Sequence, residues 1–320
     1  MELRRLAWAG LEIKAGGKTA VIDFVGDFAG LHGNGEPPRG EIPAPPSPGS
    51  VDLALLTHMH RDHADVAALE LALSDGATVL RPQPATGSGE ETAFVEGPET
   101  ALAASGLTAK ILDPWETLEV GPFEISALPA VDGFGDPQVS WVVAAEGRRI
   151  IHAGDTLFHG WWWLAASRCG PFDVAFLPAG GAIVDLPPRR PASPLPAGMD
   201  PVQAAAAAKL LGAELIVPIH YGPLHETPRY VQADDPAGSL EAAARELGVG
   251  LAWLVNALDP GTVVIGGGLG LVDRYRDLAV AAMRPLIFAD NTREVPVVPA
   301  ELGMDAGVIG AALVAAGARA

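Results

Sequence analysis

The stretch Thr57-His58-Met59-His60-Arg61-Asp62-His63 carries the densest chemistry in this sequence. It places four potential metal ligands, His58, His60, Asp62 and His63, within six positions. The preceding run, Val51-Asp52-Leu53-Ala54-Leu55-Leu56, indicates a buried strand, and apolar residues recur at helical spacing from Ala64 to Ala72. We therefore expect the ligands at a strand-to-helix turn.

The spacing within this stretch divides the four side chains into two pairs. His58 and His60 are two residues apart, so in extended backbone both imidazoles leave the same face and can hold one cation. Asp62 and His63 stand at the bend, point elsewhere and can hold a second. A lone histidine is more often a satisfied polar group, but crowded histidines and an aspartate desolvate one another unless a cation compensates. The cluster therefore favours a metal site.

The pattern His-x-His-x-Asp-His resembles the signature of the metallo-β-lactamase superfamily. Ile150-Ile151-His152-Ala153-Gly154-Asp155-Thr156 is similar to the motif whose aspartate bridges two metals, and Ile216-Val217-Pro218-Ile219-His220-Tyr221-Gly222 to the motif whose histidine completes the second metal. With Asp173 to Pro178, they most resemble the branch that includes ascorbate-6-phosphate lactonase. The resemblance covers about residues 2 to 248 and implies an α/β fold of four layers, αββα, with a dinuclear centre at the sheet edge.

The chain departs from this resemblance at the third ligand of the first metal, which is a histidine in the superfamily. No histidine occurs between His63 and His152, and Asp132 stands at the matching place. A carboxylate binds divalent cations well, although it favours manganese, iron or magnesium relative to zinc. Two alternatives stay open: Asp136 is the ligand, or Asp132 is only a turn residue before Gly133 and the first site is crippled.

The resemblance implies a metal-dependent hydrolase with two divalent ions, zinc or manganese. The expected ligands are His58, His60 and Asp132 for one ion, Asp62, His63 and His220 for the other, and Asp155 as the bridge. Two cations lower the pKa of a shared water, so we expect a metal-bound hydroxide nucleophile at about pH 7. Asp62 and Asp155 are the expected catalytic residues. A small-molecule ester, lactone or phosphoester is the expected substrate.

A different class of function also fits the sequence. In a non-catalytic ligand-binding or regulatory protein, Asp132 would have weakened the metal site and the C-terminal segment would supply a docking surface. Metal stoichiometry separates the two readings, since two ions support the enzyme and none or one supports the binder.

Composition narrows the partners. The 320 residues contain 49% hydrophobic residues, enough for a substantial core, and carry 21 Lys and Arg against 39 Asp and Glu, a net charge of −18. No basic cluster marks a nucleic-acid surface, which argues against the nuclease branch. The single cysteine, Cys169, excludes internal disulfides and fits a reducing compartment. With no signal-peptide segment after Met1, and only a short uncharged apolar stretch at 306–318, we expect a soluble cytoplasmic protein without membrane or nucleic-acid partners.

Local sequence patterns predict the secondary structure of the rest of the first domain. Hairpins are predicted around Ala15-Gly16-Gly17 and Glu146-Gly147, and a helix over Val202 to Leu211 that ends at Gly212. Glu214 to Ile219 is predicted as a buried strand that aims His220 at the site. Loops rich in proline are expected at 33–50, either an insertion or a lid, and at 187–201, bordering the active-site mouth.

For three further features we favour a structural role over a functional one. His152 is expected to be structural and not a ligand, the run Trp161-Trp162-Trp163 to anchor core and surface, and His225 to be solvated.

From about residue 248 the resemblance changes, which predicts domains at 1–248 and 249–320. Asp259 to Gly268 and Leu302 to Ala312 resemble the C-terminal end of the ROK family of sugar kinases and repressors. The phosphate loop, sugar-binding lobe and zinc-binding cysteines of a kinase are missing, so kinase activity is not expected. We predict a small α/β appendage, a helix over roughly 239–258 that crosses the junction, docking on the first domain, and possible homo-oligomers through exposed apolar surface.

Overall fold

Two six-stranded sheets lie face to face in the computed structural model, which describes residues 1–28, 31, 41–240, 242, 255–256, 258–265, 273–290 and 292–301. The first sheet runs in the order β1 (Glu2–Arg5), β2 (Leu11–Ala15), β3 (Lys18–Ile22), β4 (Val51–Leu55), β5 (Leu73–Arg81), β6 (Thr108–Ile111). The second runs in the order β13 (Leu215–Ile219), β11 (Val174–Pro178), β10 (Arg148–His152), β9 (Val139–Ala145), β8 (Phe123–Pro129), β7 (Thr117–Val120).

Both predicted hairpins are confirmed. β2 and β3 pair antiparallel around Gly16 and Gly17, which adopt φ of 53° and 75°. β9 and β10 pair antiparallel around Glu146 and Gly147, at φ of 52° and 73°. Positive φ at consecutive positions matches the right-handed twist of the flanking strands, which explains why these short turns close so tightly.

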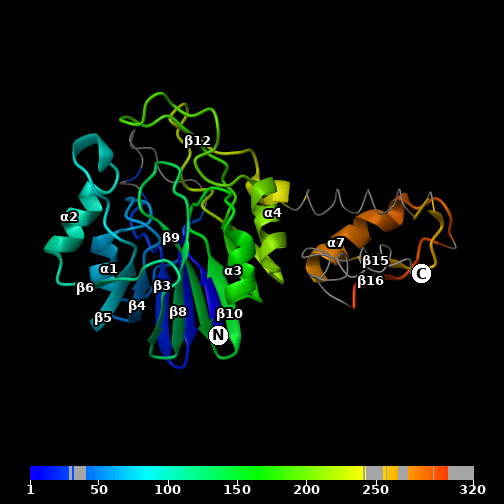
Figure 1. Ribbon diagram of the computed structural model, residues 1–320, viewed down its shortest axis with the longest axis horizontal. Helices are drawn as coiled ribbons and strands as arrows, with labels where there is room; N and C mark the ends of the chain where they lie inside the picture. Colours follow the sequence, from blue (N-terminus) through cyan, green and yellow to red (C-terminus); the bar gives the residue numbers. More distant parts are fainter. Residues whose placement is uncertain are drawn as a thin grey trace.

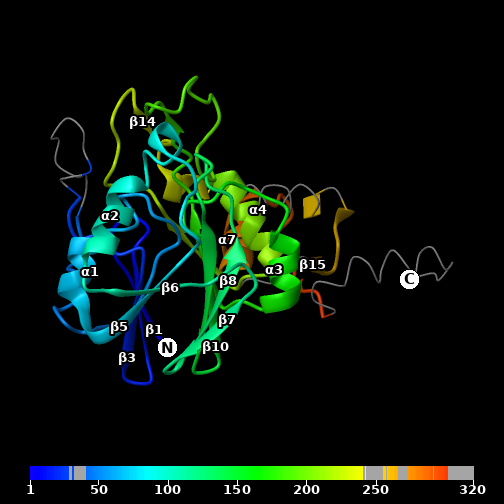
Figure 2. The ribbon, with the colours of Figure 1, turned by 60° about the vertical axis from the view of Figure 1, so that its left-hand side comes forward.

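Four helices cover the outer faces of the two sheets. They are α1 (Val66–Ala72), α2 (Glu96–Ala104), α3 (Trp162–Cys169) and α4 (Pro201–Leu211). Figures 1 and 2 show α1 and α2 beside the first sheet and α3 and α4 beside the second. The predicted end of α4 is confirmed, since Gly212 takes the left-handed conformation at φ 64°.

Three buried clusters separate these layers. One lies between the sheets and draws Leu11 and Ile13 from the first and Trp141 and Val143 from the second. The others lie between each sheet and its helices, so that Leu69 of α1 belongs to one of them, and the second sheet with α3 and α4 to the other. The order of layers is therefore αββα, as the sequence predicts.

The parallel strands explain where chemistry can gather. β3 and β4 run parallel in the first sheet, and β10, β11 and β13 run parallel in the second. Carboxyl ends of parallel strands share one edge, where open α/β sheets bind their ligands. Six of the seven predicted metal ligands follow β4, β10 or β13, and Asp132 follows β8, which β9 separates from β10.

One strand prediction is wrong in its burial. Only Ile219 of β13 is buried, because β13 is the edge strand of its sheet and its other residues are partly or fully exposed. An apolar run of this length cannot distinguish an edge strand from a central one.

The described part of the C-terminal segment is a small α/β unit, as expected. β15 (Val263–Ile265) and β16 (Val297–Pro299) pair in parallel, and α7 (Asp273–Met283) precedes a short 3₁₀ turn, η3 (Arg284–Leu286). Its buried apolar residues, among them Ile265 and Met283, form a cluster of their own. Most of the helix predicted at roughly 239–258, Gly266 to Gly268, the stretch 302–312 and residues 33–40 lie outside the described residues. Docking on the first domain and self-association stay predictions.

Among the described residues, no helix combines the length and the apolar character that crossing a bilayer requires.

Candidate metal centre

The turn between β4 and α1 presents its side chains to one point between the two sheets. Potential ligand atoms gather there in two groups, each with its atoms within 4.8 Å of one another. The first group consists of His58, His60, Asp132 and Asp155, and the second of Asp62, His63 and His220. The structure thus brings all seven predicted ligands together, with Asp155 in the first group.

Asp155 stands between the two groups. Its Oδ1 lies 3.8 Å from Nε2 of His58, while its Oδ2 lies 4.0 Å from Nε2 of His63 and 3.7 Å from Nε2 of His220. One oxygen therefore faces each group, which is the arrangement that a bridging carboxylate needs. The amide of Gln138 donates to Oδ1 at 2.7 Å and fixes this orientation.

Several buried ligand atoms have no hydrogen-bond partner among the described residues. They are Nε2 of His58, His63 and His220, and Oδ1 of Asp132. A buried polar atom without a partner lowers stability by about 1–3 kcal/mol. These four atoms belong to the residues of the two ligand groups. Imidazole nitrogens and carboxylate oxygens are donors that divalent transition metals accept. The residues present therefore fit two cations.

A chain of hydrogen bonds sets the tautomers of His58 and His63. Asp23 accepts from Nδ1 of His63 at 2.7 Å and from the Thr57 hydroxyl at 2.7 Å through the same oxygen. Because the Thr57 hydroxyl donates its only proton to Asp23, its oxygen accepts from Nδ1 of His58 at 3.0 Å. Both histidines therefore carry a proton on Nδ1, which makes Nε2 the nitrogen available to a metal, as in metal sites with a histidine–carboxylate pair.

Asp132 and Asp136 have different roles in the structure. Oδ2 of Asp132 accepts from the backbone N–H groups of Phe134 at 2.7 Å and Asp136 at 2.9 Å, while its Oδ1 lies 3.8 Å from Nδ1 of His60. Asp136 accepts from Nε2 of His60 at 2.9 Å. Asp132 thus presents a free oxygen to the first group, and Asp136 holds the histidine beside it.

The second group is braced by Trp8. Its indole N–H donates to Oδ2 of Asp62 at 3.0 Å, and its ring packs 4.2 Å from that of His220. Oδ2 of Asp62 lies 3.5 Å from Nε2 of both His63 and His220. The backbone of Trp8 accepts from the N–H of His220 at 3.2 Å. One side chain and its carbonyl therefore position two potential ligands.

The surroundings of the cluster shift the pKa values of His58 and His63 in opposite directions. Burial lowers the pKa of His58 well below its ordinary value, and nearby His63 and His60 lower it further. Burial also opposes a charge on His63, but the carboxylates of Asp62 and Asp23 outweigh it and raise the pKa of His63 to about 10. Without a metal, protonated His63 therefore offsets part of the carboxylate charge.

The carboxylates respond to the same balance. Burial raises the pKa of Asp132 to about 6, and the charge of Asp155 contributes. Burial would also raise the pKa of Asp62, but His63 and His220 bring it well below its ordinary value. Asp62 is therefore ionised across the physiological range.

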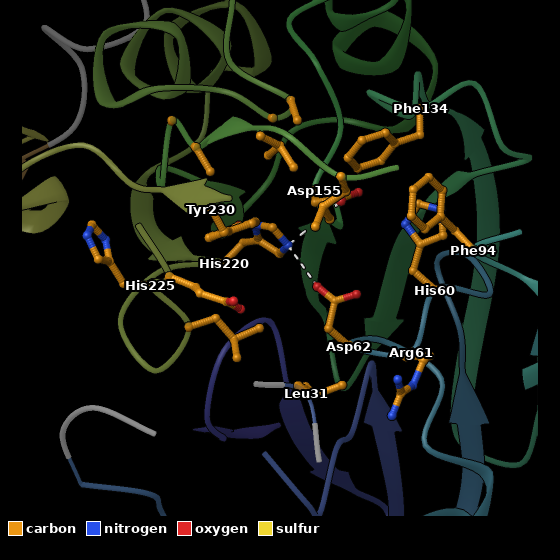
Figure 3. A pocket seen from close by; sticks show the side chains of 18 of the residues that line it. Leu31, His60, Arg61, Asp62, Phe94, Phe134, Asp155, His220, His225 and Tyr230 are labelled. Carbon is orange, nitrogen blue, oxygen red and sulfur yellow. Dashed lines mark ion pairs between the residues drawn. The ribbon is translucent and has the colours of Figure 1, made fainter. Parts of the chain in front are cut away.

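A cavity of about 340 Å³ opens onto the cluster. Figure 3 shows His220 paired with both Asp62 and Asp155, and Phe94 and Phe134 lie beside His60. The predicted proline-rich loop does border the mouth, because its end, residues 197–199, lines the cavity.

His152, the tryptophan run 161–163 and His225 were predicted to have no role in the site, and the structure places each of them. His152 is buried and structural: its Nε2 donates to the carbonyl of Ala9 at 2.7 Å, and it belongs to neither ligand group. In the tryptophan run, Trp162 is buried in the core while Trp161 and Trp163 are exposed. His225 is half-buried and lines the cavity, so it is only partly exposed to solvent.

Sequence reasoning missed the residues that orient the ligands. These are Trp8, Asp23 and Gln138, together with the cavity residues Phe94 and Tyr230. Asp23 directly follows a strand, at the same edge as His58, and that position was a usable signal. Trp8, Phe94 and Gln138 come from loops and Tyr230 from the two-residue strand β14 (Tyr230–Val231), and no local pattern marks them.

Comparison with known proteins agrees with this geometry. A family model described as "Beta-lactamase superfamily domain" matches residues 7–221, and one described as "ROK family" matches residues 230–318. A UPF0173 metal-dependent hydrolase of Rubrobacter xylanophilus is 32% identical over 221 residues, 67% of this chain and 78% of that protein. Another, of Methanoculleus marisnigri, is 27% identical over 230 residues, 68% of this chain and 80% of that protein.

Solved structures share the fold. An isothiocyanate hydrolase from Delia radicum gut bacteria aligns with a TM-score of 0.55 at 20% identity, covering 78% of this chain and 93% of that one. Igni18, a metallo hydrolase of Ignicoccus hospitalis, aligns with a TM-score of 0.51 at 20% identity, covering 75% and 90%. From its match to the family model and to its relatives, the chain belongs to the metallo-β-lactamase superfamily of metal-dependent hydrolases.

Proposed function

We propose that this metal-dependent hydrolase works with two divalent ions, zinc or manganese, and acts on a small-molecule ester, lactone or phosphoester. His58, His60 and Asp132 would hold one ion, Asp62, His63 and His220 the other, and Asp155 both. The observation that carries the proposal is the set of four buried ligand atoms without partners, which converge in two groups bridged by Asp155.

When bound, the ions would lower the pKa of a water toward neutrality and stabilise the negative charge that develops on the substrate. The chain's own residues supply orientation. Ionised Asp62 lies at the cavity base, where it can accept a hydrogen bond from the attacking water and direct its lone pair toward the substrate. Trp8 holds Asp62 in that position.

The cavity walls are largely apolar. Among the described lining residues, apolar side chains predominate, including Phe94, Phe134 and Met199. Electrostatic interactions are stronger where water is excluded. The wall therefore strengthens the stabilisation available at the base.

Metal removal and restoration test the proposal. The protein would be stripped with a chelator, reloaded with zinc or manganese, and assayed against a panel of 4-nitrophenyl esters, aryl lactones and phosphoesters. We expect turnover only after reloading, and its loss in His60→Ala and Asp155→Ala. Turnover by the stripped protein would contradict the proposal.

The binding-protein alternative makes a different prediction in the same experiment. It expects none or one ion per chain and no turnover of any panel member. Elemental analysis of the reloaded protein therefore separates the two, because the hydrolase requires two ions.

A further inference from the structure

Tyr230 lines the cavity beside the candidate metal centre and carries a phenol hydroxyl. It belongs to β14 (Tyr230–Val231), which pairs antiparallel with β12 (Ile183–Val184). The hydroxyl oxygen is buried and has no hydrogen-bond partner among the described residues. Tyr230 lines the cavity together with Asp62, Asp155 and His220, and it lies beyond residue 221, where the match to the superfamily model ends.

A buried hydroxyl without a partner needs an explanation. The ring of Tyr230 packs at 6.0 Å from Trp8, which itself contacts His220, so the phenol is positioned by the residues that brace the second ligand group. A phenol is protonated at neutral pH and can donate one hydrogen bond. The acceptor that satisfies it would be an oxygen of a molecule in the cavity.

The opposite wall is aromatic. The rings of Phe94 and Phe134 pack 4.9 Å apart, and each lies 5.8 Å from the ring of His60. Both phenylalanines line the cavity. Such a pair offers a stacking surface for an aryl or branched apolar group, placed beside the first ligand group.

Apart from the two proposed ions, the cavity offers few groups that would bind an anion. Apart from the predicted ligands and His225, its described ionisable lining consists of Arg61, Glu226 and Tyr230. Arg61 is exposed and already engaged in another interaction. Sites for phosphoryl groups use several cationic or N–H donors, because the charge spreads over several oxygens. A single neutral donor matches a group with one reacting oxygen.

We infer that the substrate is an uncharged carboxylic ester or lactone with an aryl or branched apolar group. That group packs on Phe94 and Phe134, and Tyr230 donates a hydrogen bond to the carbonyl oxygen. In the reaction, the oxygen of water bonds to the carbonyl carbon, the bond from that carbon to the leaving oxygen breaks, and the leaving oxygen takes a proton from the water. This inference rests on the proposed function and narrows its substrate.

Two matched variants test the role of Tyr230 with the metal-loaded protein. Tyr230→Phe removes the hydroxyl from the cavity. Tyr221→Phe removes a hydroxyl that accepts from Arg5 at 3.2 Å and does not line the cavity. Metal content and circular dichroism of both variants confirm that the centre and the fold are intact.

With 4-nitrophenyl butyrate, we expect kcat of Tyr230→Phe to fall about 100-fold, the lower end of the loss when one oxyanion donor is removed. KM should change little, because the donor acts mainly as charge develops, and Tyr221→Phe should keep the parent kcat. An unchanged kcat in Tyr230→Phe overturns the assigned role. Turnover of bis(4-nitrophenyl) phosphate without turnover of any ester or lactone overturns the substrate class, although the proposed function stands.

Binding of an unreactive ketone separates this inference from the proposed function. 4-Phenyl-2-butanone carries a carbonyl and an aryl group but no bond to hydrolyse. By calorimetry, Tyr230→Phe should bind it about 5-fold more weakly than the parent protein, as for the loss of one neutral hydrogen bond. Phe134→Ala should weaken it as well. Binding that neither variant changes overturns the inference, whether or not the protein hydrolyses the panel.

Discussion

Asp23 accepts a hydrogen bond of 2.7 Å from Nδ1 of His63, and the same oxygen accepts another of 2.7 Å from Thr57. Both carboxylate and imidazole are fully enclosed. Through this one oxygen, the end of β3 in the first sheet fixes the proton positions of His63 and, by way of Thr57, of His58. Asp23 belongs to neither ligand group. It nevertheless directs Nε2 of one histidine in each group, His58 and His63, toward a metal.

The substitution Asp23→Asn should therefore weaken binding of the second metal ion, which His63 is expected to hold. The new amide can present its N–H to His63, which favours the wrong tautomer and leaves no bare Nε2. We expect metal affinity to fall about 10- to 100-fold, the usual effect of losing such a partner. Competition with a chelating dye measures this. Asp52→Asn, at a partly exposed pair with Lys18, serves as the control, and equal affinities in the two variants would contradict the role of Asp23.

Asp132→Asn tests whether this aspartate is a ligand. Asparagine keeps an oxygen for the N–H groups of Phe134 and Asp136, so the loop should hold its shape while the charge is lost. We expect one of two ions to be lost on dialysis, as measured by elemental analysis, with Asp113→Asn as a surface control. If Asp132→Ala retains the parent's metal content, Asp132 is only a turn residue.

Metal binding should release a proton near neutral pH. In the metal-free protein the pKa of His63 is raised to about 10, so at pH 7 its Nε2 is protonated and must lose that proton to bind an ion. Affinity should rise with pH, by about tenfold per unit for one proton. Below the pKa of Asp132, raised to about 6, a second proton competes and affinity falls more steeply. Calorimetry in buffers of different ionisation enthalpy counts the protons, and no release at pH 7 would count against this charge balance.

Gly154 should not tolerate a side chain. At φ +67° an added Cβ would lie 2.7 Å from Nε2 of Gln138 and 2.9 Å from Oγ1 of Thr57, two groups that orient the ligands. Gly147→Ala is a matched control, since its φ is +73° but nothing lies within 4 Å of the added atom. Both variants carry the cost of a left-handed backbone. We expect the free energy of unfolding of Gly154→Ala to be about 1–3 kcal/mol lower than that of Gly147→Ala, as measured by urea denaturation. Gly154→Ala should also lose metal. Equal stabilities would show that the crowding is relieved.

Local sequence was enough to predict which residues gather in the two groups, because most of them belong to a short motif at a strand end. His58 to His63 form one such motif, and parallel strands bring Asp155 and His220 to the same edge without further information. Asp132 was found by its place after a strand, although its residue type departs from the superfamily pattern.

The orienting and cavity-lining residues were not predictable in the same way. Trp8, Gln138 and Tyr230 meet the centre from loops and a two-residue strand whose positions depend on tertiary packing. The exposed edge position of β13 escaped prediction for a similar reason, because burial depends on which strand lies beside it and not on its own apolar run.

Anomalous scattering from crystals grown with zinc or manganese tests the dinuclear centre most directly. We expect two peaks per chain: one within coordination distance, about 2.0–2.3 Å, of His58, His60 and Asp132, and one within the same distance of Asp62, His63 and His220. Asp155 should contact both. A single peak, or peaks away from these two groups, would contradict the two-ion centre.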